Sequence, residues 1–485
     1  MQSLWRATCP IEKREPLAQN RTADAVVIGA GITGILTAFL LQKTGKEVVV
    51  LERGRIAGGQ TEGTTAKITA QHGLIYRRLM DRLGEGPARQ YAQANQEAVA
   101  AYLRLIREEA IDCDLQRTCA YVYSLDLRLL AREAAAAKQL GLSASLVERP
   151  PLPFPAAGAV RFRDQAQFHP LKFIRALAQK LTIYENTPVQ WADDQRVQTP
   201  GGTVRAKKLL FTCHDPFVNF PGLYFARMHQ ERSYVLALEN APFPAGMWIG
   251  ADRPAYSFRR YGDLLLFGGQ GHRTGKNPGG GQYAALRRAA RTLFPQSREV
   301  YAWSAQDGMP AGGIPYIGPY SPSRPHWYVA AGFQKWGMST AMAAAILLSG
   351  ALCSKEPAWA PVFRPGYLRP GELAAIGRDG KESAAGLARR FFAVPPASAG
   401  ELAARRGGVV LWNGKKAGVY KESAAAETVV SPRCPHLGCQ LAWNPEEKTW
   451  DCPCHGSRFD RQGKLLNGPA QTDLPARTRR AGPVQ

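Results

Sequence analysis

The chain has 485 residues, more than one compact core usually holds and enough for two or three domains. Its composition, 45% hydrophobic and 21% charged, is that of a globular protein and excludes a fibre or a disordered chain. The formal charge of +23 is spread along the chain without one basic stripe. We therefore expect a solvated surface and no nucleic-acid partner, with an acidic redox partner or an anionic substrate as the alternative.

The N-terminus predicts that the protein is not exported. Residues 1–21 mix charged residues with proline and lack the apolar stretch of a signal peptide. The longest apolar run, residues 338–353, falls short of the roughly 20 residues that a bilayer requires. The sequence thus predicts a cytoplasmic protein without a transmembrane segment, in which this run is a buried helix.

A glycine-rich turn follows the first predicted strand. Residues 25–28 read AVVI, G-x-G-x-x-G follows at 29–34, a helical pattern covers 35–43, and a second strand at 48–51 ends in Glu52. Glycines allow close approach to a pyrophosphate, whose charge a helix N-terminus favours, and the acid can bond a ribose hydroxyl. This spacing predicts dinucleotide binding. The residues assigned to it are Gly29, Ala30, Gly31, Ile32, Thr33, Gly34, Glu52 and Arg53.

The next segment favours FAD over NAD. Residues 58–70, GGQTEGTTAKITA, resemble the phosphate-side loop of the D-amino-acid oxidase and glycine oxidase superfamily. The resemblance implies that Thr61, Thr64 and Thr65 lie near the pyrophosphate; a threonine-rich surface loop is the alternative. Residues 168–212 resemble the superfamily's second flavin segment, in which the backbone of Val189 would face adenine.

A third segment extends the resemblance. Residues 313–318, GIPYIG, precede a strand at 327–330 and the turn 332–339, GFQKWGMS, which opens the apolar helix. In the superfamily this helix directs its N-terminus at the pyrimidine edge of the flavin, where N–H groups stabilise negative charge. Gly337, Met338 and Ser339 are therefore expected at the flavin. A glycine-rich turn before a core helix is the structural alternative.

The region between these segments predicts a substrate domain. Helical patterns at 86–110 and 126–140 and strand patterns at 233–238 and 256–267 indicate an α+β insertion. The glycine run at 269–275 has the wrong spacing for a second nucleotide site, and KNPGGG after it cannot open a helix, so we expect electrons to come from an organic substrate. Candidate catalytic or carboxylate-binding residues, each of which also fits a surface charge, are Arg259, Arg260, His272 and Lys335.

Two cysteine- and histidine-containing segments lie near the C-terminus. CPHLGC at 434–439 and CPCHGS at 452–457 offer two thiolates and two imidazoles from two loops, which a 2Fe-2S cluster with mixed ligands requires. A zinc site is the alternative. The segments closely resemble those of Rieske proteins. The resemblance implies that Cys434 and Cys452 bind one iron and that His436 and His455 bind the other.

The same resemblance implies features around the cluster. Cys439 and Cys454 match the pair that forms a disulfide between the cluster loops in Rieske domains of respiratory complexes. Ser457 matches the hydroxyl that bonds a cluster sulfur and raises the potential, whereas Phe459 replaces a tyrosine of the family. We expect a potential below that of respiratory Rieske proteins but within the Rieske range.

These parts predict an α/β FAD-binding Rossmann-type domain with an α+β substrate domain, plus a small all-β Rieske domain. The resemblance implies an oxidoreductase that passes electrons between an organic substrate, an amine or amino acid oxidised at its C–N bond, and the cluster, and then to an external one-electron acceptor. A redox carrier or sensor, or a reductase in which the cluster feeds the flavin, are the alternatives. The expected boundaries are 1–365 for the flavoprotein (FAD-binding segments about 20–80, 160–225 and 300–352; substrate domain about 81–159 and 226–299), 366–404 for a linker with a short helix, and 405–485 for the Rieske domain.

Overall fold

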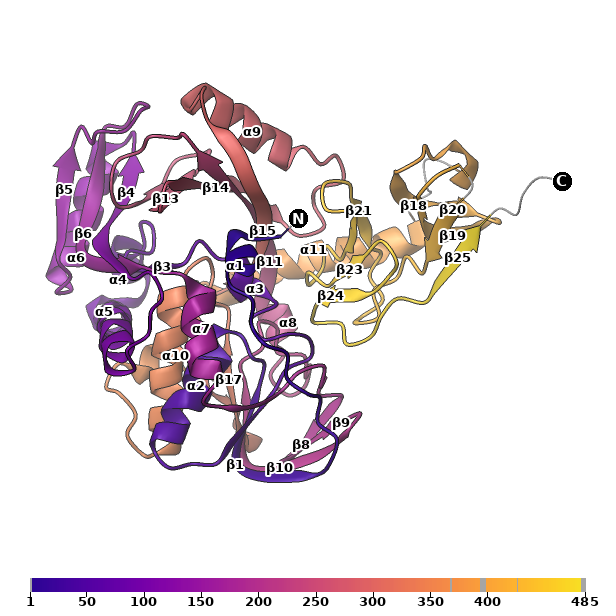
Figure 1. Ribbon diagram of the computed structural model, residues 1–485, viewed down its shortest axis with the longest axis horizontal. Helices are drawn as coiled ribbons and strands as arrows, with labels where there is room; N and C mark the ends of the chain where they lie inside the picture. The colour runs from indigo at the N-terminus through magenta and orange to yellow at the C-terminus, as the bar shows by residue number, and fades with distance from the viewer. Residues whose placement is uncertain (1, 367–368, 393–397, 425, 481–485) are drawn as a thin grey trace. The chain divides into compact units, whose positions relative to one another are not determined.

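The computed structural model describes residues 2–366, 369–392, 398–424 and 426–480 (Figure 1). The chain divides into two compact units. The first comprises Met1–His214, Ser233–Gln270 and Ala284–Pro370, and the second Asp215–Arg232, Gly271–Tyr283 and Gly371–Gln485. Among the described helices, none is long and apolar enough to cross a membrane.

An eight-stranded, mainly parallel sheet forms one half of the first unit. Its order is β16-β17-β10-β1-β2-β7, with β9 pairing to β10 and β8 to β9. The central strands are apolar on both faces because helices cover them, as parallel sheets require. Its strands are β1 (Arg21–Ile28), β2 (Val48–Leu51), β7 (Thr182–Tyr184), β8 (Trp191–Asp193), β9 (Arg196–Thr199), β10 (Gly202–Phe211), β16 (Tyr316–Ser321) and β17 (Arg324–Ala331).

Helix α2 (Ile32–Lys43) packs against α7 (Pro170–Ala178) and α10 (Gly337–Leu352), and Figure 1 shows the three beside one another. Both α2 and α10 are buried over most of their length, which explains why neither has a polar face. The predicted apolar helix at 338–353 is α10. Shorter helices of this half are α1 (Leu4–Thr8), α3 (Gln60–Gly63) and η1 (Ala360–Phe363).

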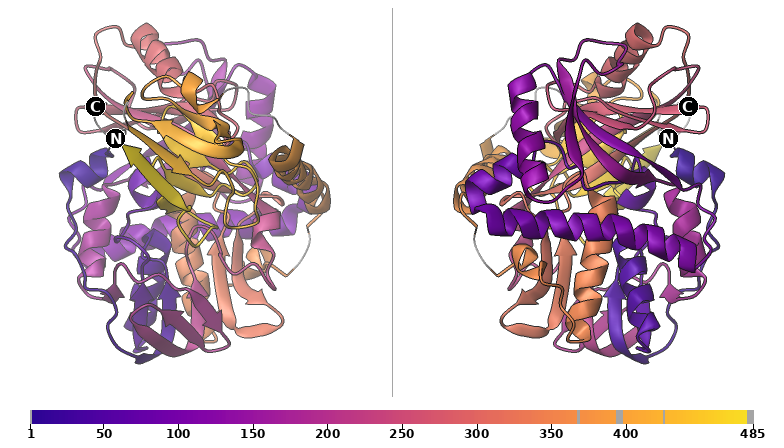
Figure 2. Two further views of the ribbon diagram at one scale, coloured as in Figure 1. Left: turned by 90° about the vertical axis from the view of Figure 1, so that its right-hand side faces the viewer. Right: turned by 90° about the vertical axis from the view of Figure 1, so that its left-hand side faces the viewer.

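A nine-stranded sheet forms the other half, in the order β15-β11-β14-β13-β12-β4-β6-β3, with β5 paired to β6. The predicted strand at 256–267 is a hairpin, and β15, predicted among the FAD-binding segments, belongs to this sheet. Figure 2 shows the long helix α5 crossing α10. The elements are β3 (Lys67–Ile68), β4 (Gln116–Ser124), β5 (Ala144–Glu148), β6 (Gly158–Gln167), β11 (Met228–Glu239), β12 (Met247–Gly250), β13 (Ser257–Tyr261), β14 (Leu264–Arg273), β15 (Arg298–Pro310), α4 (Tyr76–Leu83), α5 (Glu85–Glu108), α6 (Leu127–Gln139) and α9 (Gln282–Leu293).

The second unit contains two four-stranded antiparallel sheets, β18-β19-β20-β25 and β21-β22-β23-β24. Trp450 is fully buried, and the Trp443 ring packs between it and Tyr420, with ring centroids 4.7 and 5.4 Å away. The elements are α8 (Tyr224–Arg227), α11 (Glu372–Phe392), η2 (Ala399–Glu401), β18 (Gly407–Trp412), β19 (Lys415–Lys421), β20 (Ala426–Val430), β21 (Ala442–Asn444), β22 (Thr449–Asp451), β23 (Arg458–Asp460), β24 (Leu465–Asn467) and β25 (Ala476–Arg480).

The observed division differs from the predicted one in two respects. Asp215–Arg232 and Gly271–Tyr283, which were assigned to the flavoprotein, belong to the unit that contains the cysteine loops. The segment predicted as a linker holds α11, a helix of 21 residues, rather than a short helix. Residues 367–368 and 393–397 of that segment lie outside the described residues.

Candidate active site and cluster site

The glycine-rich turn joins β1 to α2 in a conformation that requires glycine. Gly29 has a φ of +106°, and a Cβ added to Gly34 would lie 1.8 Å from the Gly29 carbonyl oxygen. Gly31 is the N-cap of α2, and because glycine has no side chain it makes no cap hydrogen bond to the first turn. The turn therefore presents the N-terminus of a buried helix, as a pyrophosphate site needs.

Glu52 follows β2 and lies against this turn. One oxygen of its carboxylate accepts a hydrogen bond from Ala30 N at 2.8 Å, and the other accepts from Gly54 N at 2.7 Å. Burial raises the pKa of Glu52, although these two N–H groups act in the opposite direction. The Thr61 hydroxyl accepts from Ile32 N at 3.1 Å, so the threonine loop is tied to the first turn of α2.

The remaining residues predicted to bind FAD lie in three places. Thr64 and Thr65 follow α3; the Thr64 hydroxyl accepts from Ala66 N at 2.9 Å. Thr33 is buried within α2, whereas Arg53 is exposed after Glu52. Val189 is buried in the connection between β7 and β8, and Gly337, Met338 and Ser339 form the first turn of α10.

The first turn of α10 contacts a buried histidine that sequence reasoning missed. Nε2 of His72 lies 2.8 Å from the Ser339 hydroxyl and 2.9 Å from Thr69 O, which can only accept, so Nε2 carries the proton. Nδ1 accepts from the Tyr91 hydroxyl at 2.7 Å. Burial lowers the pKa of His72 to about 3, so the ring is neutral. His72 follows the threonine loop directly, but nothing in the local pattern distinguishes it from a core histidine.

Arg259 does not have the surroundings of a carboxylate-binding residue. It is 1% exposed, and its guanidinium donates to the carbonyl oxygens of Thr65, Ala66 and Phe168 at 2.6 to 3.1 Å. These backbone acceptors occupy the guanidinium, so we assign Arg259 a structural role. Of the other candidates, Arg260 and Lys335 are exposed, and His272 belongs to the second unit.

The two cysteine-containing segments fold as similar closed loops. In the first, Cys434 N donates to Cys439 O and Gly438 N donates to Cys434 O, each at 2.9 Å. In the second, Cys452 N donates to Ser457 O at 2.8 Å and Gly456 N to Cys452 O at 3.0 Å. The loops connect β20 to β21 and β22 to β23, so two antiparallel sheets hold them.

The side chains of these loops fit a metal cluster with mixed ligands. Cys434 and Cys452 are buried thiols, and the Cys452 thiol beside it lowers the pKa of Cys434. His436 and His455 lie with ring centroids 5.0 Å apart, and burial lowers their pKa values to about 4 and about 3. Nδ1 of each ring is buried and has no hydrogen-bond partner among the described residues. Neutral imidazoles with unpaired buried nitrogen atoms are suited to binding a metal.

The Ser457 hydroxyl accepts a hydrogen bond from Ala470 N at 3.0 Å and lies near the Cys434 thiol. Phe459, which replaces a family tyrosine, is fully buried and offers no hydroxyl. The hydrogen bond expected from the Ser457 hydroxyl to a cluster sulfur stays a prediction.

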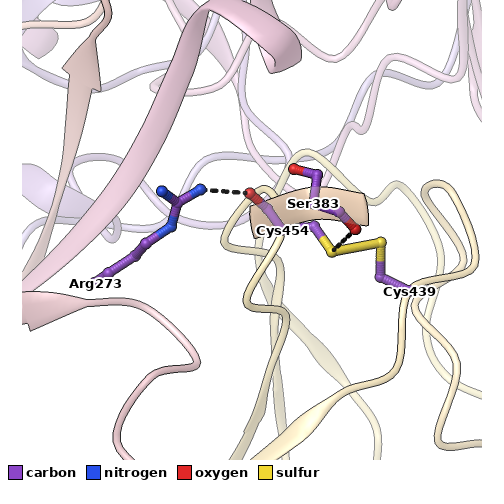
Figure 3. The surroundings of a disulfide bond; sticks show 4 residues. All are labelled: Arg273, Ser383, Cys439 and Cys454. Carbon is purple, nitrogen blue, oxygen red and sulfur yellow. Dashed lines mark hydrogen bonds between the residues drawn. A yellow bond between two sulfur atoms is a disulfide. The ribbon is translucent and has the colours of Figure 1, made fainter. Parts of the chain in front are cut away.

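Cys439 and Cys454 form a disulfide, which confirms the prediction that the chain contains one (Figure 3). The Sγ atoms of both lie within 4.8 Å of Cys452 Sγ, but the disulfide leaves only Cys452 of these three able to bind a metal. Helix α11 covers the bond: Ser383 O lies 3.6 Å from Cys454 Sγ, and a Cβ added to Gly386 would lie 2.5 Å from the same atom.

A cavity of about 290 Å³ lies beside the disulfide, with mostly apolar walls. At its edge Asp379 on α11 forms an ion pair with Arg273 and accepts a hydrogen bond from His229 at 3.1 Å. Burial alone would lower the pKa of His229, but Asp379 and Glu231 raise it to about 9. The other lining residues are Phe225, Ala226, Met228, Ile376, Gly380, Ser383, Ala384, Leu387, Leu437, Cys439, Cys454 and His455.

Comparison with known proteins assigns both sites to families. The profile of the family described as FAD dependent oxidoreductase matches residues 24–350, about two thirds of the chain. The chain belongs to this family. A second profile, the Rieske [2Fe-2S] domain, matches residues 392–477 of the oxidoreductase. Its cofactors are FAD and a Rieske 2Fe-2S cluster, and the predicted fold class is confirmed.

The oxidoreductase has a relative with the same architecture. It is 34% identical over 489 residues to YhfW of Bacillus subtilis (strain 168), whose name describes a Rieske 2Fe-2S iron-sulfur protein, and the match covers 97% of this chain and 96% of the relative. Glycine oxidase from Geobacillus kaustophilus has a TM-score of 0.60 and 20% identity over 72% of this chain and 99% of its own. L-proline dehydrogenase from P. horikoshii has a TM-score of 0.60 and 17% identity over 71% of this chain and 97% of its own. These structures share the fold of the oxidoreductase.

Proposed function

We propose that this oxidoreductase oxidises an amine or amino acid at its C–N bond and delivers the electrons, through the Rieske cluster, to an external one-electron acceptor. The supporting observation is that one chain combines the fold of enzymes named for glycine and L-proline with a Rieske [2Fe-2S] domain. When bound, FAD accepts two electrons as a hydride and the cluster transfers one electron at a time. The substrate loses a hydride from carbon and a proton from nitrogen, and two acceptor molecules are reduced for each imine formed.

The ligands that we propose for the cluster are the four cysteine and histidine side chains of the two loops that do not take part in the disulfide. Cys434 and Cys452 would bind one iron through their adjacent buried thiols. His436 and His455 would bind the other through Nδ1, the ring nitrogen that lacks a partner among the described residues. Because both rings are neutral, they can bind iron without first losing a proton at neutral pH.

The FAD site that we propose uses the glycine turn and the two loops tied to it. Glu52 would bind a ribose hydroxyl, since its carboxylate lies at the N-terminus of α2. The first turn of α2 and Thr61 would hold the pyrophosphate, and the first turn of α10 would face the flavin's pyrimidine edge. His72 would orient the Ser339 hydroxyl in that turn, because its ring is fixed on both sides by hydrogen bonds.

The acceptor that we propose is an acidic one-electron carrier protein. The chain carries a formal charge of +23, which favours encounter with an acidic partner over a basic one. Association would then weaken as salt is added, since exposed charges are screened beyond about 8 Å at physiological ionic strength. Measuring the rate at which an acidic carrier protein of higher reduction potential oxidises the cluster at rising salt tests this proposal, and a rate that does not change with salt contradicts it.

The test of the function is anaerobic mixing of the purified holoprotein with amines, N-methyl amino acids and amino acids, while flavin absorbance and the cluster EPR signal are followed together. We expect one compound to bleach the flavin and to produce the signal of the reduced cluster. The matched control is Cys434→Ser, which should still bleach but show no cluster signal. If no compound bleaches the flavin while a reduced ferredoxin reduces both the flavin and the cluster, the proposal is replaced by one of the alternatives: a redox carrier or sensor, or a reductase in which the cluster feeds the flavin.

A further inference from the structure

The two histidines of the cluster loops differ in what contacts their rings. Nε2 of His436 lies 2.8 Å from Oδ1 of Asn219, 217 positions earlier in the chain. No hydrogen-bond partner of the His455 ring lies among the described residues. Asn219 belongs to Asp215–Arg232, which is part of the second unit. The unit therefore supplies a polar side chain to one imidazole and not to the other.

The direction of this hydrogen bond follows from the surroundings of the ring. A neutral imidazole carries one proton, on Nδ1 or on Nε2. Nδ1 of His436 is buried and lacks an acceptor among the described residues, so a proton there would be unpaired. With the proton on Nε2, the ring donates to Asn219 Oδ1 and Nδ1 presents a lone pair. The contact thus selects the tautomer that can bind iron through Nδ1.

The segment that carries Asn219 is held in place on several sides. Leu223 N donates to Asn219 O at 2.9 Å, which closes a turn over residues 219–223. The Phe225 ring lies edge-on to His436 and His455, with centroid distances of 5.4 and 5.2 Å. The side chain of Gln471 donates to Phe217 O at 3.3 Å. A side chain on a turn held in this way can fix the orientation of the ring it contacts.

We propose that Asn219 is a positioning residue for the cluster: its amide oxygen fixes the tautomer and orientation of His436 and lowers the reduction potential of the iron that this histidine binds. The physical cause is that an acceptor on the distal N–H makes a ligating imidazole a stronger electron donor, which stabilises the oxidised metal. The inference rests on the proposed ligation of iron by His436. Asn219, which the sequence assigns to the flavoprotein, would thus adjust the reduction potential of the cluster that receives the flavin's electrons.

The experiment is a redox titration of the full-length holoprotein, with the midpoint potential of the cluster followed by EPR and visible circular dichroism. Asn219→Leu removes the acceptor and should raise the potential by roughly one tenfold step in the reduction equilibrium, about 59 mV for a one-electron centre. Asn219→Asp provides a stronger, charged acceptor and should lower it. The matched control is Gln471→Leu, which loosens the same segment at an exposed position without touching His436 and should leave the potential unchanged.

The outcomes separate this proposal from the assignments on which it rests. Chemical titration needs no substrate, so failure of the substrate proposal does not affect it, and a wild-type protein without a Rieske EPR signal would contradict the ligand assignment instead. Equal potentials and EPR spectra in wild type and Asn219→Leu overturn the role of Asn219. If Asn219→Leu assembles less cluster, Asn219→Asp should restore the content with a lowered potential, and equal loss in both variants overturns the proposal.

Discussion

Removing the Cys439–Cys454 disulfide should destabilise the second unit by about 3 kcal/mol. The two cysteines are 15 residues apart in sequence. In the chain-entropy description, a cross-link that closes a loop of about 15 residues stabilises the folded state by about 3 kcal/mol, because it restricts the unfolded chain. At about 1.4 kcal/mol per tenfold, the equilibrium constant for opening should rise roughly 140-fold. Both side chains are buried, so the double change to alanine leaves no unpaired polar group.

Native-state hydrogen exchange measured by mass spectrometry tests this magnitude in the full-length holoprotein. Slowly exchanging amides report the free energy of opening of the unit that contains them. In Cys439→Ala/Cys454→Ala, peptides of the cluster loops and the strands beside them should exchange up to about 140-fold faster, whereas peptides of the first unit should not change. Cys353→Ala, which removes a free cysteine of the first unit, is the control. Unchanged exchange at equal cluster content, or equal acceleration in both units, would refute the reasoning.

Three further perturbations follow from the described contacts. Gly34→Ala should lose bound FAD, measured as flavin per chain after purification, because its Cβ would lie 1.8 Å from Gly29 O. Arg259→Met leaves three carbonyl oxygens without a donor and should lower the free energy of unfolding by about 3 kcal/mol or more, measured by urea unfolding. The pKa of His229 is raised to about 9, so its contact with Asp379 should stabilise the folded state. This stabilisation should be fully present below about pH 6.5 and should be lost as pH rises through 9. The measurement is Tm as a function of pH.

Each of these changes has a matched control. Gly86→Ala adds a methyl group where nothing lies within 4 Å and should keep its FAD. Arg260→Met alters the exposed neighbour of Arg259 on the same strand and should change stability by less than about 0.5 kcal/mol. The Tm difference between wild type and His229→Gln should be present at pH 6 and vanish by pH 10. A difference that persists at high pH contradicts the assigned charge.

The nucleotide-binding half could be predicted because its parts are specified locally. The apolar run, glycine spacing and helical period that define β1, α2 and β2 lie within about 30 consecutive residues. The observed α5, Glu85–Glu108, differs from the predicted 86–110 by only one or two residues at each end. The cluster loops could be predicted for the same reason, since the cysteine and histidine of each loop lie within four consecutive positions. Predictions of this kind need no knowledge of which segments meet in space.

Features that depend on distant segments were not predicted. Asn219 and His436 are 217 positions apart, and neither has a neighbour pattern that indicates the other. Arg259 is a candidate in the sequence because an arginine on a strand could hold a substrate carboxylate. Its actual partners are backbone carbonyl oxygens, which carry no sequence signal. The same limit applies to the buried His72 at α10.

The discontinuous second unit has a consequence for biosynthesis. Its first segment, Asp215–Arg232, emerges from the ribosome roughly 200 residues before Cys434, which at about 5–20 residues per second is a delay of about 10–40 s. During that interval Asn219 and Phe225 have no cluster loop to contact, so the surface that they form stays uncovered in the nascent chain. Iron insertion into the complete site must therefore await synthesis of both cluster loops, and truncation before these loops would leave this segment as a target for chaperones or proteases.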